Sequence, residues 1–183
     1  LAFIENHDTD RFLGEGNNLP MLKQASTLLL TTRRIPQLYY GTEVMMNGVK
    51  SKSDGYVRKD FPGGWTGDAT NALTPAGRTK IQNECYDFYK TILNWRKGND
   101  VIAKGSMVQF MVQNGVYAYA RQYEGKTIFV MLNGTDAETT VPLKFYKEIL
   151  KDSKQGKDIL SGKAITFGEE LKMGPRESLV IEL

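Results

Sequence analysis

Apolar residues recur along the first hundred residues in two ways, as short continuous runs and as stripes with helical spacing. The runs LAFI at residues 1–4 and IPQLYY at residues 35–40 are each short enough for a buried strand. Residues 19–33 carry apolar side chains at steps of three and four, with Pro20 in the first turn, and a second stripe predicts a helix over residues 75–97. The order strand, helix, strand with short connections predicts two parallel strands joined by a right-handed crossover.

The pattern changes to short alternating runs from Val101 onward. SMVQFMV, VYAYARQY and KTIFVML follow one another, and Asn114-Gly115 between the first two is a strong hairpin signal. The runs TTVPL, ITF, ELKM and SLVIEL alternate with turns that contain glycine. This part of the chain predicts an antiparallel β-sandwich, and we place the domain boundary between residues 98 and 105.

Residues 41–74 have no sustained period and are rich in Gly, Asp and Ser. A loop of this length inside a compact domain usually has a functional reason or is disordered. Phe61 and Trp65 argue against disorder, because large aromatic residues are scarce in disordered segments.

The composition limits the classes of partner that the chain is expected to bind. The formal net charge is +3 with the basic residues spread along the chain, which does not favour a nucleic-acid or anionic-membrane surface. No run approaches the roughly 20 apolar residues that span a bilayer. Cys85 falls on the apolar face of a predicted helix, so we expect a buried, inert thiol. The chain begins with Leu1, which indicates a mature form or an excised piece.

The only histidine lies in the stretch FIENHDTDRF, residues 3–12. His7 between Asn6 and Asp8 has two interpretations. The plain one is a strand-end cap, in which Asp8 accepts from backbone N–H groups. The functional one follows from position, because α/β barrels and open α/β sheets place their sites at the carboxyl ends of parallel strands.

FIENHDTDRF resembles the fourth short motif of glycoside hydrolase family 13, the α-amylase family, in which Asn-His-Asp ends the seventh barrel strand. IPQLYYGTE is similar to the eighth strand with its following Gly-x-Glu, and DGYVRKDFPGGW is similar to the next loop in the neopullulanase and cyclomaltodextrinase branch, Bacteroides-type enzymes in particular. The resemblance covers the whole chain. It implies α/β plus all-β architecture: residues 1–98 as the last two βα units of a TIM (β/α)8 barrel, and residues 99–183 as a C-terminal antiparallel β-sandwich.

The resemblance implies retaining hydrolysis of α-glucosidic bonds in starch-derived glucans or maltooligosaccharides. Asp8 would be the family's third carboxylate, a transition-state stabiliser that accepts sugar hydroxyls and supplies negative charge. His7 and Asn6 would belong to the substrate-binding residues: His7 would donate to a hydroxyl of the same sugar, while Asn6 is better interpreted as shaping the turn beside it.

Other residues are weaker substrate-binding candidates. Arg11 is one, since it could cover a sugar or pair with a carboxylate, although a surface arginine is its plainer interpretation. Tyr40 ends a predicted barrel strand, and Phe61 and Trp65 can offer apolar faces to pyranose rings or simply pack within their own loop. Asp54, Asp60 and Asp68 lack the spacing of a calcium loop, so we expect neither a metal nor a cofactor.

The nucleophile and the general acid of the family lie upstream of this segment. We therefore expect the segment alone to be inactive. Truncation would expose strand edges, so residues 1–40 should pack in a non-barrel arrangement or pair with a second copy, giving a homodimer. Two alternatives stay open: a non-catalytic carbohydrate-binding or structural module, and a full-length glucosyltransferase. Through the resemblance, we expect the parent protein to be periplasmic or otherwise exported.

Overall fold

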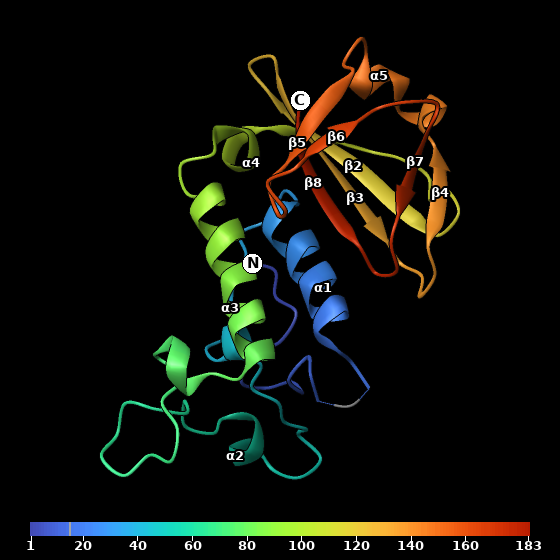
Figure 1. Ribbon diagram of the computed structural model, residues 1–183. Helices are drawn as coiled ribbons and strands as arrows, with labels where there is room; N and C mark the ends of the chain where they lie inside the picture. The colour runs from blue at the N-terminus through green and yellow to red at the C-terminus, as the bar shows by residue number, and fades with distance from the viewer. Residues whose placement is uncertain (15) are drawn as a thin grey trace. The chain divides into compact units, whose positions relative to one another are not determined.

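The computed structural model describes residues 1–14 and 16–183 (Figure 1). The chain forms two compact units. The first, here called the N-terminal unit, comprises Leu1–Leu29 and Ile35–Lys90. The second, called the sandwich unit, comprises Leu30–Arg34 and Thr91–Leu183. The division at residues 98 and 99 that the sequence indicates for the parent protein stays a prediction.

Two helices dominate the N-terminal unit, and they run side by side in Figure 1. Helix α1 covers Leu19–Thr31, and Asn18 Oδ1 accepts from the Met21 N–H at 3.1 Å in its first turn. Helix α3 covers Lys80–Arg96. A buried hydrogen bond of 2.5 Å joins Ser26 Oγ of α1 to the Tyr89 hydroxyl of α3. The predicted helices are therefore present, and polar side-chain contacts join them: besides the Ser26–Tyr89 hydrogen bond, Lys23 Nζ lies 2.7 Å from Glu84 Oε1.

Helix α3 begins five residues later than predicted. Thr74 and Pro75 do start a turn, but it is the 3-10 helix η2 (Pro75–Gly77), which Thr74 caps. The α-helix starts after Thr79, where the Gln82 N–H donates to Thr79 Oγ1 at 3.3 Å and the Thr79 N–H donates to Gln82 Oε1 at 2.9 Å. This reciprocal capping box fixes the start of the helix.

The two apolar runs at residues 1–4 and 35–40 meet in a parallel bridge between Ala2 and Pro36. The Ala2 N–H donates to the Ile35 carbonyl at 2.9 Å, and the Gln37 N–H donates to the Ala2 carbonyl at 2.8 Å. The predicted strands are thus reduced to a single bridge, because a lone pair of short segments has no neighbouring strand to extend the ladder. Parallel pairing is also what barrel neighbours would make, and the expected non-barrel packing of residues 1–40 stays a prediction. The assignment to a barrel and pairing with a second copy stay predictions.

The segment 41–74 is packed, in part, around short helical turns. The 3-10 helix η1 covers Thr42–Val44, and helix α2 covers Asp54–Val57. Val44 and Val57 are fully or almost fully buried. The loop therefore contributes apolar side chains to the core of the N-terminal unit, in agreement with the expectation that it is ordered.

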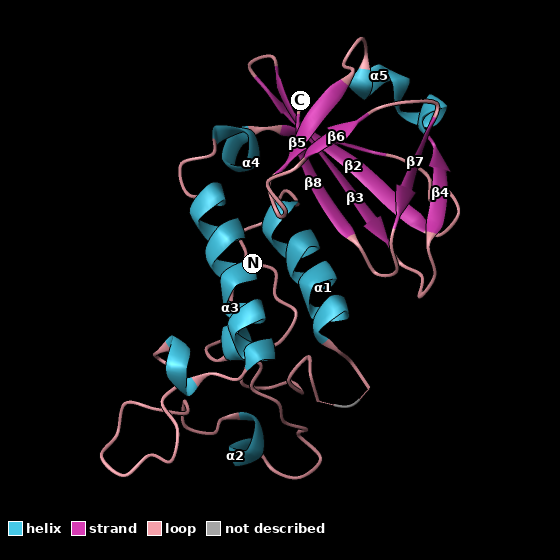
Figure 2. Ribbon diagram, viewed as in Figure 1, coloured by secondary structure: helices cyan, strands magenta, loops and turns pink. Residues whose placement is uncertain are grey.

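The sandwich unit contains a six-stranded antiparallel sheet in the order β1-β2-β3-β8-β5-β6 and a two-stranded antiparallel sheet of β4 and β7 (Figure 2). The strands are β1 (Ser106–Gln109), β2 (Val116–Tyr123), β3 (Lys126–Asn133), β4 (Thr139–Pro142), β5 (Gln155–Asp158), β6 (Ala164–Thr166), β7 (Glu170–Met173) and β8 (Ser178–Glu182). The short helix α4 (Asp100–Lys104) precedes β1, and η3 (Leu143–Tyr146) and α5 (Lys147–Leu150) connect β4 to β5. The predicted sandwich is confirmed, whereas β5 and the short helices were not anticipated.

The Asn114-Gly115 hairpin is confirmed. Both residues have positive φ, 50° and 78°, as a type I′ turn requires, and Gln113 bridges Val116 across the turn. The same geometry recurs at Glu124-Gly125 between β2 and β3, with φ values of 48° and 78°.

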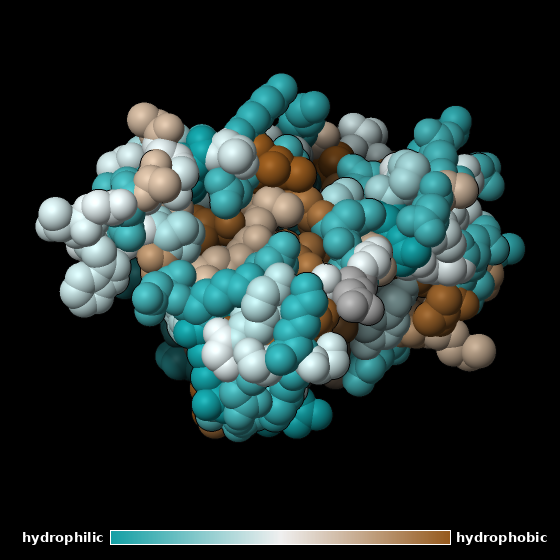
Figure 3. All heavy atoms as spheres, turned by 90° about the horizontal axis from the view of Figure 1, so that it is seen from below, coloured by the Kyte–Doolittle hydropathy of each residue, from teal (hydrophilic) through white to brown (hydrophobic). Residues whose placement is uncertain are grey.

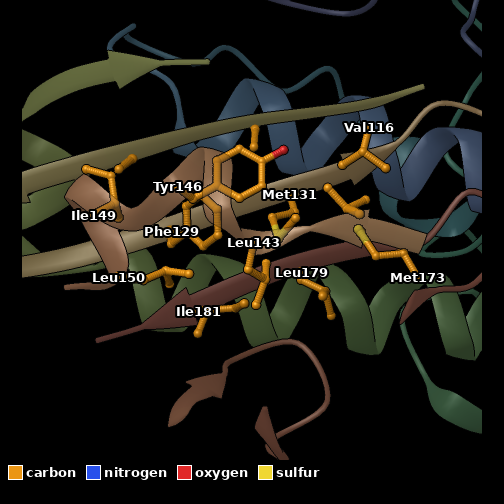
Figure 4. Packing of buried hydrophobic residues seen from close by; sticks show 13 residues of the cluster. Val116, Phe129, Met131, Leu143, Tyr146, Ile149, Leu150, Met173, Leu179 and Ile181 are labelled. Atoms are coloured by element: carbon orange, nitrogen blue, oxygen red, sulfur yellow. The ribbon is translucent and has the colours of Figure 1, made fainter. Parts of the chain in front are cut away.

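The central strands of the six-stranded sheet are covered on both faces, which explains why five of the eight residues of β2 and six of the eight of β3 are buried. One face packs under β4, β7 and η3, where Tyr146 lies 5.2 Å from Phe129 between ring centroids (Figure 4). The other face carries Tyr119, Val130 and Val180 and packs against Val101 and other residues of the unit. Strands in a sheet covered on both sides read as continuous apolar runs.

Arg121 organises the second face of the sheet. Its guanidinium is fully buried and donates to four backbone carbonyls, those of Thr31, Ile102, Gly105 and Ser106, at 2.8–3.2 Å. Thr31 ends α1, and Ile102 lies in the short helix α4. A cation at helix ends is favourable because the last carbonyls have no partner within the helix.

Among the described residues, no helix is long and apolar enough to cross a membrane.

Candidate functional site

The Asn6–Asp8 turn follows directly on the apolar segment that bridges Pro36. The Asp8 N–H donates to Asn6 Oδ1 at 2.8 Å, and the Asn6 N–H donates to Thr9 Oγ1 at 3.0 Å. Such side chain-to-backbone bonds close Asx-type turns. The Asn6 amide oxygen therefore shapes the turn, the part expected of it from the sequence.

His7 and Asp8 form the exposed face of this turn. His7 Nε2 lies 3.0 Å from Asp8 Oδ2, and their side chains are 59% and 57% exposed. Both groups can therefore be reached from solvent in this chain. Each carboxylate oxygen has two acceptor positions, so Asp8 can accept further hydrogen bonds beside this contact.

Arg58 is the partner of Asp8 that sequence reasoning missed. Its Nη2 lies 2.9 Å from Asp8 Oδ1 and 3.3 Å from Asp54 Oδ2, and its Nε donates to the His7 carbonyl at 2.9 Å. Helix α2 positions it, because Asp54 and Arg58 are four residues apart. That spacing is the local signal in DGYVRKDF; nothing local links Arg58 to Asp8, fifty residues away.

Lys50 makes a second connection between the loop and the turn. Its Nζ donates to the Asp8 carbonyl at 2.9 Å and lies 3.7 Å from Asp54 Oδ1, and its N–H donates to Asp10 Oδ1. Two cations, Lys50 and Arg58, thus hold the turn that carries His7 and Asp8. Through these two residues, the loop 41–74 holds the turn in place.

A buried ion pair lies beneath the turn. Arg11 Nη1 is 3.3 Å from Glu5 Oε1, and neither side chain is more than 2% exposed. Arg11 also donates to the carbonyls of Tyr40 at 2.6 Å and Val57 at 3.1 Å. Glu5 accepts in addition from Thr42 Oγ1 and the Phe12 N–H. Both charged groups are therefore hydrogen-bonded within the N-terminal unit, although Arg11 Nη2 is buried with no hydrogen-bond partner among the described residues.

The burial of Arg11 corrects the expectation that it lies on the surface. Its guanidinium carbon lies 3.9 Å from the centre of the Tyr39 ring and 4.8 Å from that of Tyr40. A charge enclosed in this way cannot touch a sugar, so the direct substrate contact considered for Arg11 is not what this structure offers. The sequence alone did not indicate that Arg11 is buried, because its pairing with Glu5 becomes visible only in the folded unit.

Three aromatic candidates lie on exposed or half-buried loop positions. Tyr40 is 41% exposed, and its hydroxyl donates to the Lys59 carbonyl at 2.6 Å. Phe61 is half-buried. Trp65 is 74% exposed in a turn where its N–H donates to Asp68 Oδ2 at 2.9 Å. The structure leaves these rings accessible, and sugar stacking on them stays a prediction.

The remaining acidic residues serve local structure. Asp54 pairs with Arg58 and Lys50, and Asp68 closes the Trp65 turn. In the part of the chain that the structure describes, no group of three or more His, Cys, Asp or Glu side chains is arranged to hold a metal ion.

Cys85 is a buried free thiol, as predicted. It lies on α3, and its Sγ is 3.6 Å from the Thr42 carbonyl oxygen. Burial raises the pKa of this thiol to about 12, so the reactive thiolate is not formed near neutral pH.

The described residues of this turn offer hydrogen-bonding groups of the kind that a polyhydroxy ligand can use. Asp8 is an acceptor and His7 a donor or acceptor on one exposed turn. The nearby carboxylate of Asp54 is bound to two cations.

A family model matches residues 107–182 and describes the cyclo-malto-dextrinase C-terminal domain. Among curated proteins, an α-amylase of Niallia circulans is 30% identical over 176 residues, which is 92% of this chain and 29% of that protein. A cyclomaltodextrin glucanotransferase of Thermoanaerobacterium thermosulfurigenes is 31% identical over 167 residues, 87% of this chain and 21% of that protein. The chain thus spans less than a third of these relatives.

Solved structures show the same fold across nearly the whole chain. An Anoxybacillus α-amylase matches with a TM-score of 0.76 at 21% identity, covering 98% of this chain and 37% of that one. The α-amylase of Geobacillus thermoleovorans, solved with acarbose, matches with a TM-score of 0.74 at 23% identity, covering 98% of this chain and 38% of that one. The chain is therefore similar to the C-terminal region of α-amylase-family enzymes, glycoside hydrolase family 13, and its residues 107–182 match the C-terminal domain of that group.

Proposed function

We propose that this chain is the C-terminal part of a retaining α-glucan hydrolase that cleaves α-glucosidic bonds in starch-derived glucans. The single observation that carries the proposal is the exposed His7–Asp8 turn, at the end of a segment in parallel pairing and held by Arg58. Polar residues at such strand ends form the sites of (β/α)8 barrels.

Asp8 acts in this proposal as the transition-state stabiliser. Its carboxylate accepts hydroxyl protons of the sugar at the scissile bond and places a negative charge near the oxocarbenium-like centre. His7 donates to a hydroxyl of the same sugar. Arg58 holds the Asp8 carboxylate from the side at 2.9 Å, which orients it without removing all of its acceptor positions.

The nucleophile and the general acid come from the part of the parent protein that precedes this chain. A retaining glycosidase needs two carboxyl groups about 5–5.5 Å apart on either side of the bond. The chain alone is therefore inactive. The exposed apolar side chains of Leu1, Phe3 and Ile35, which are 85%, 45% and 70% exposed, are the surface on which the preceding strands pack. Figure 3 shows apolar side chains among polar ones on the face that it presents.

Within the family, the proposal places the parent in the neopullulanase and cyclomaltodextrinase branch and outside the cytoplasm. The stretch DGYVRKDFPGGW and the cyclo-malto-dextrinase type of the C-terminal domain support that branch. Export rests on the sequence resemblance alone.

A second candidate is transfer of the glucosyl group to an acceptor other than water. The curated relatives include cyclomaltodextrin glucanotransferases, such as that of Thermoanaerobacterium thermosulfurigenes, alongside the α-amylase. Both activities share the covalent intermediate and differ only in what attacks it.

The test uses a polypeptide that contains this chain together with its preceding segment. It is incubated with soluble starch, pullulan and a cyclodextrin, and the products are followed by chromatography and by proton NMR. Reducing sugars released first as the α-anomer support a retaining hydrolase. Release of the β-anomer contradicts retention, and no action on any α-glucan contradicts the proposal. Adding glucose as an acceptor separates the two candidates, since a transferase makes new oligosaccharides.

A further inference from the structure

The sandwich unit contains a pocket that lies apart from the His7–Asp8 turn in the chain. Its volume is about 620 Å³, and all the residues that line it belong to Thr91–Leu183. It is formed by the end of α3, the loop into α4, the β2–β3 turn and the end of β8. This volume falls within the range of about 300–1,000 Å³ that small-ligand sites occupy.

Trp95 forms a fixed aromatic wall of the pocket. Its Nε1 donates to Glu182 Oε1 at 2.7 Å, which ties the last turn of α3 to β8. The ring also packs against the apolar cluster that contains Ile128 and Val180. An indole held by a hydrogen bond at one edge and by core packing loses little freedom when a ligand stacks on it.

Tyr123 supplies a second ring. It pairs with Lys126 across the tight Glu124-Gly125 turn, so its backbone position is set by the β2–β3 hairpin. The ring is half-buried against the same cluster as Trp95, and Lys104 Nζ lies 5.6 Å from its centre. Both rings that line the pocket are therefore anchored by regular structure.

The polar lining is almost balanced in charge. Two lysines, Lys97 and Lys126, stand against three carboxylates, Asp100, Glu124 and Glu182. A strongly charged ligand would meet groups of its own sign whichever sign it had. A neutral ligand with many hydroxyls can use both kinds of group, since carboxylates accept and ammonium groups donate.

We propose that this pocket is a second saccharide-binding site, which takes a short stretch of a neutral oligosaccharide. The C–H faces of the sugar stack on Trp95 and Tyr123, and Glu182 Oε2 accepts a hydroxyl proton while Oε1 stays with the indole. Thr127 and Lys126 offer further polar contacts from the edge of β3. The saccharide class rests on the pocket, whereas the choice of an α-glucan as ligand rests on the proposed function.

The chain is well suited to a direct test because it contains two tryptophans, Trp65 and Trp95. The variant Trp65→Phe leaves Trp95 as the only indole, and Trp95→Phe leaves Trp65. Each variant is titrated with maltotriose and with cellotriose while tryptophan emission is recorded, and isothermal titration calorimetry on Trp65→Phe gives a second readout. Circular dichroism checks that each variant is folded.

In Trp65→Phe, maltotriose should change the Trp95 emission saturably, with a Kd of about 1 mM. Tyr123→Ala in this background should raise that Kd about tenfold, whereas Phe145→Ala, an exposed aromatic position elsewhere in the sandwich unit, should leave it unchanged. A similar response to cellotriose supports a saccharide site in the pocket and counts against a preference of that site for α-glucans.

The proposal is overturned if emission and heat both stay flat up to about 100 mM maltotriose and cellotriose, a hundred times the expected Kd. It is also overturned if Trp65 responds in Trp95→Phe while Trp95 does not respond in Trp65→Phe, because the sugar then binds the 41–74 loop. Neither result affects the proposed function, which is tested by hydrolysis in the parent protein.

Discussion

The buried pair of Glu5 and Arg11 allows a sharp test of what holds the candidate site in place. Arg11→Met keeps most of the side-chain length but removes the guanidinium. It deletes the 3.3 Å ion pair to Glu5 and the hydrogen bonds to the carbonyls of Tyr40 and Val57. Glu5 would then remain as an uncompensated carboxylate with less than 3% of its surface exposed.

Breaking a buried pair by removing one partner costs about 3–5 kcal/mol. Arg58→Met is the matched control, because Arg58 pairs with Asp8 at 2.9 Å but is 40% exposed. Exposed pairs contribute about 0.2–1 kcal/mol. The two substitutions are chemically identical, so the difference between them reports burial rather than the loss of an arginine as such.

The assay is urea denaturation followed by circular dichroism, with hydrogen exchange at the Phe12 amide, which donates to Glu5. With a urea slope of about 2 kcal/mol/M, a loss of 4 kcal/mol lowers the midpoint by about 2 M. Arg58→Met should shift it by less than about 0.5 M. Equal and small shifts for both variants would refute the reasoning, as would unchanged exchange at Phe12 in Arg11→Met.

Two further predictions concern other parts of the chain. Because burial raises the pKa of Cys85 to about 12, stability should fall as the pH rises from about 9 toward 12, where only the unfolded thiol loses its proton; Cys85→Ala should remove that part of the pH dependence in denaturation curves. Arg121→Met leaves three buried carbonyls and one part-buried carbonyl without their donor and should destabilise the sandwich unit by about 3 kcal/mol or more, measured by urea denaturation, while Arg176→Met at an exposed pair with Asp136 should cost far less.

The elements that were predictable from sequence are those whose signals are local. Asn114-Gly115 specifies its own hairpin, since both positions need positive φ. The alternating runs gave most of the strands in the sandwich unit. Helix α4, five residues long, has no room for a periodic stripe, so its Asn99 cap was the only local signal.

The candidate site was predictable only in part. The turn built by Asn6 and the exposure of His7 and Asp8 follow from a short polar stretch after an apolar run. The contact of Asp8 with Arg58 joins segments that are far apart in the sequence. The contact of Arg11 with Glu5 depends on how the chain between them folds. A charged residue looks like a surface residue in sequence, and only its partner in space explains why it is buried.

Ile81 shows the same difficulty for an apolar residue. It lies at helical spacing from Cys85 and Ile92 of α3, yet it is 49% exposed, whereas those two residues are fully buried. Tyr89 of the same helix is buried, and its hydroxyl is satisfied there by a hydrogen bond with Ser26. Helical spacing predicts a face, and the neighbouring helix decides how far along that face burial extends.

The central claim is that Asp8 stabilises the transition state of α-glucan cleavage, and the kcat of Asp8→Asn in the parent protein tests it most directly. Asn keeps the shape of Asp8 but removes its charge. We expect kcat on soluble starch to fall by about 10²–10³-fold, the usual effect of removing one transition-state contact, with a much smaller change in KM. Asp136→Asn, which alters an exposed carboxylate paired with Arg176 in the sandwich unit, should leave kcat unchanged. An Asp8→Asn enzyme with the kcat of the unmodified protein would contradict the account.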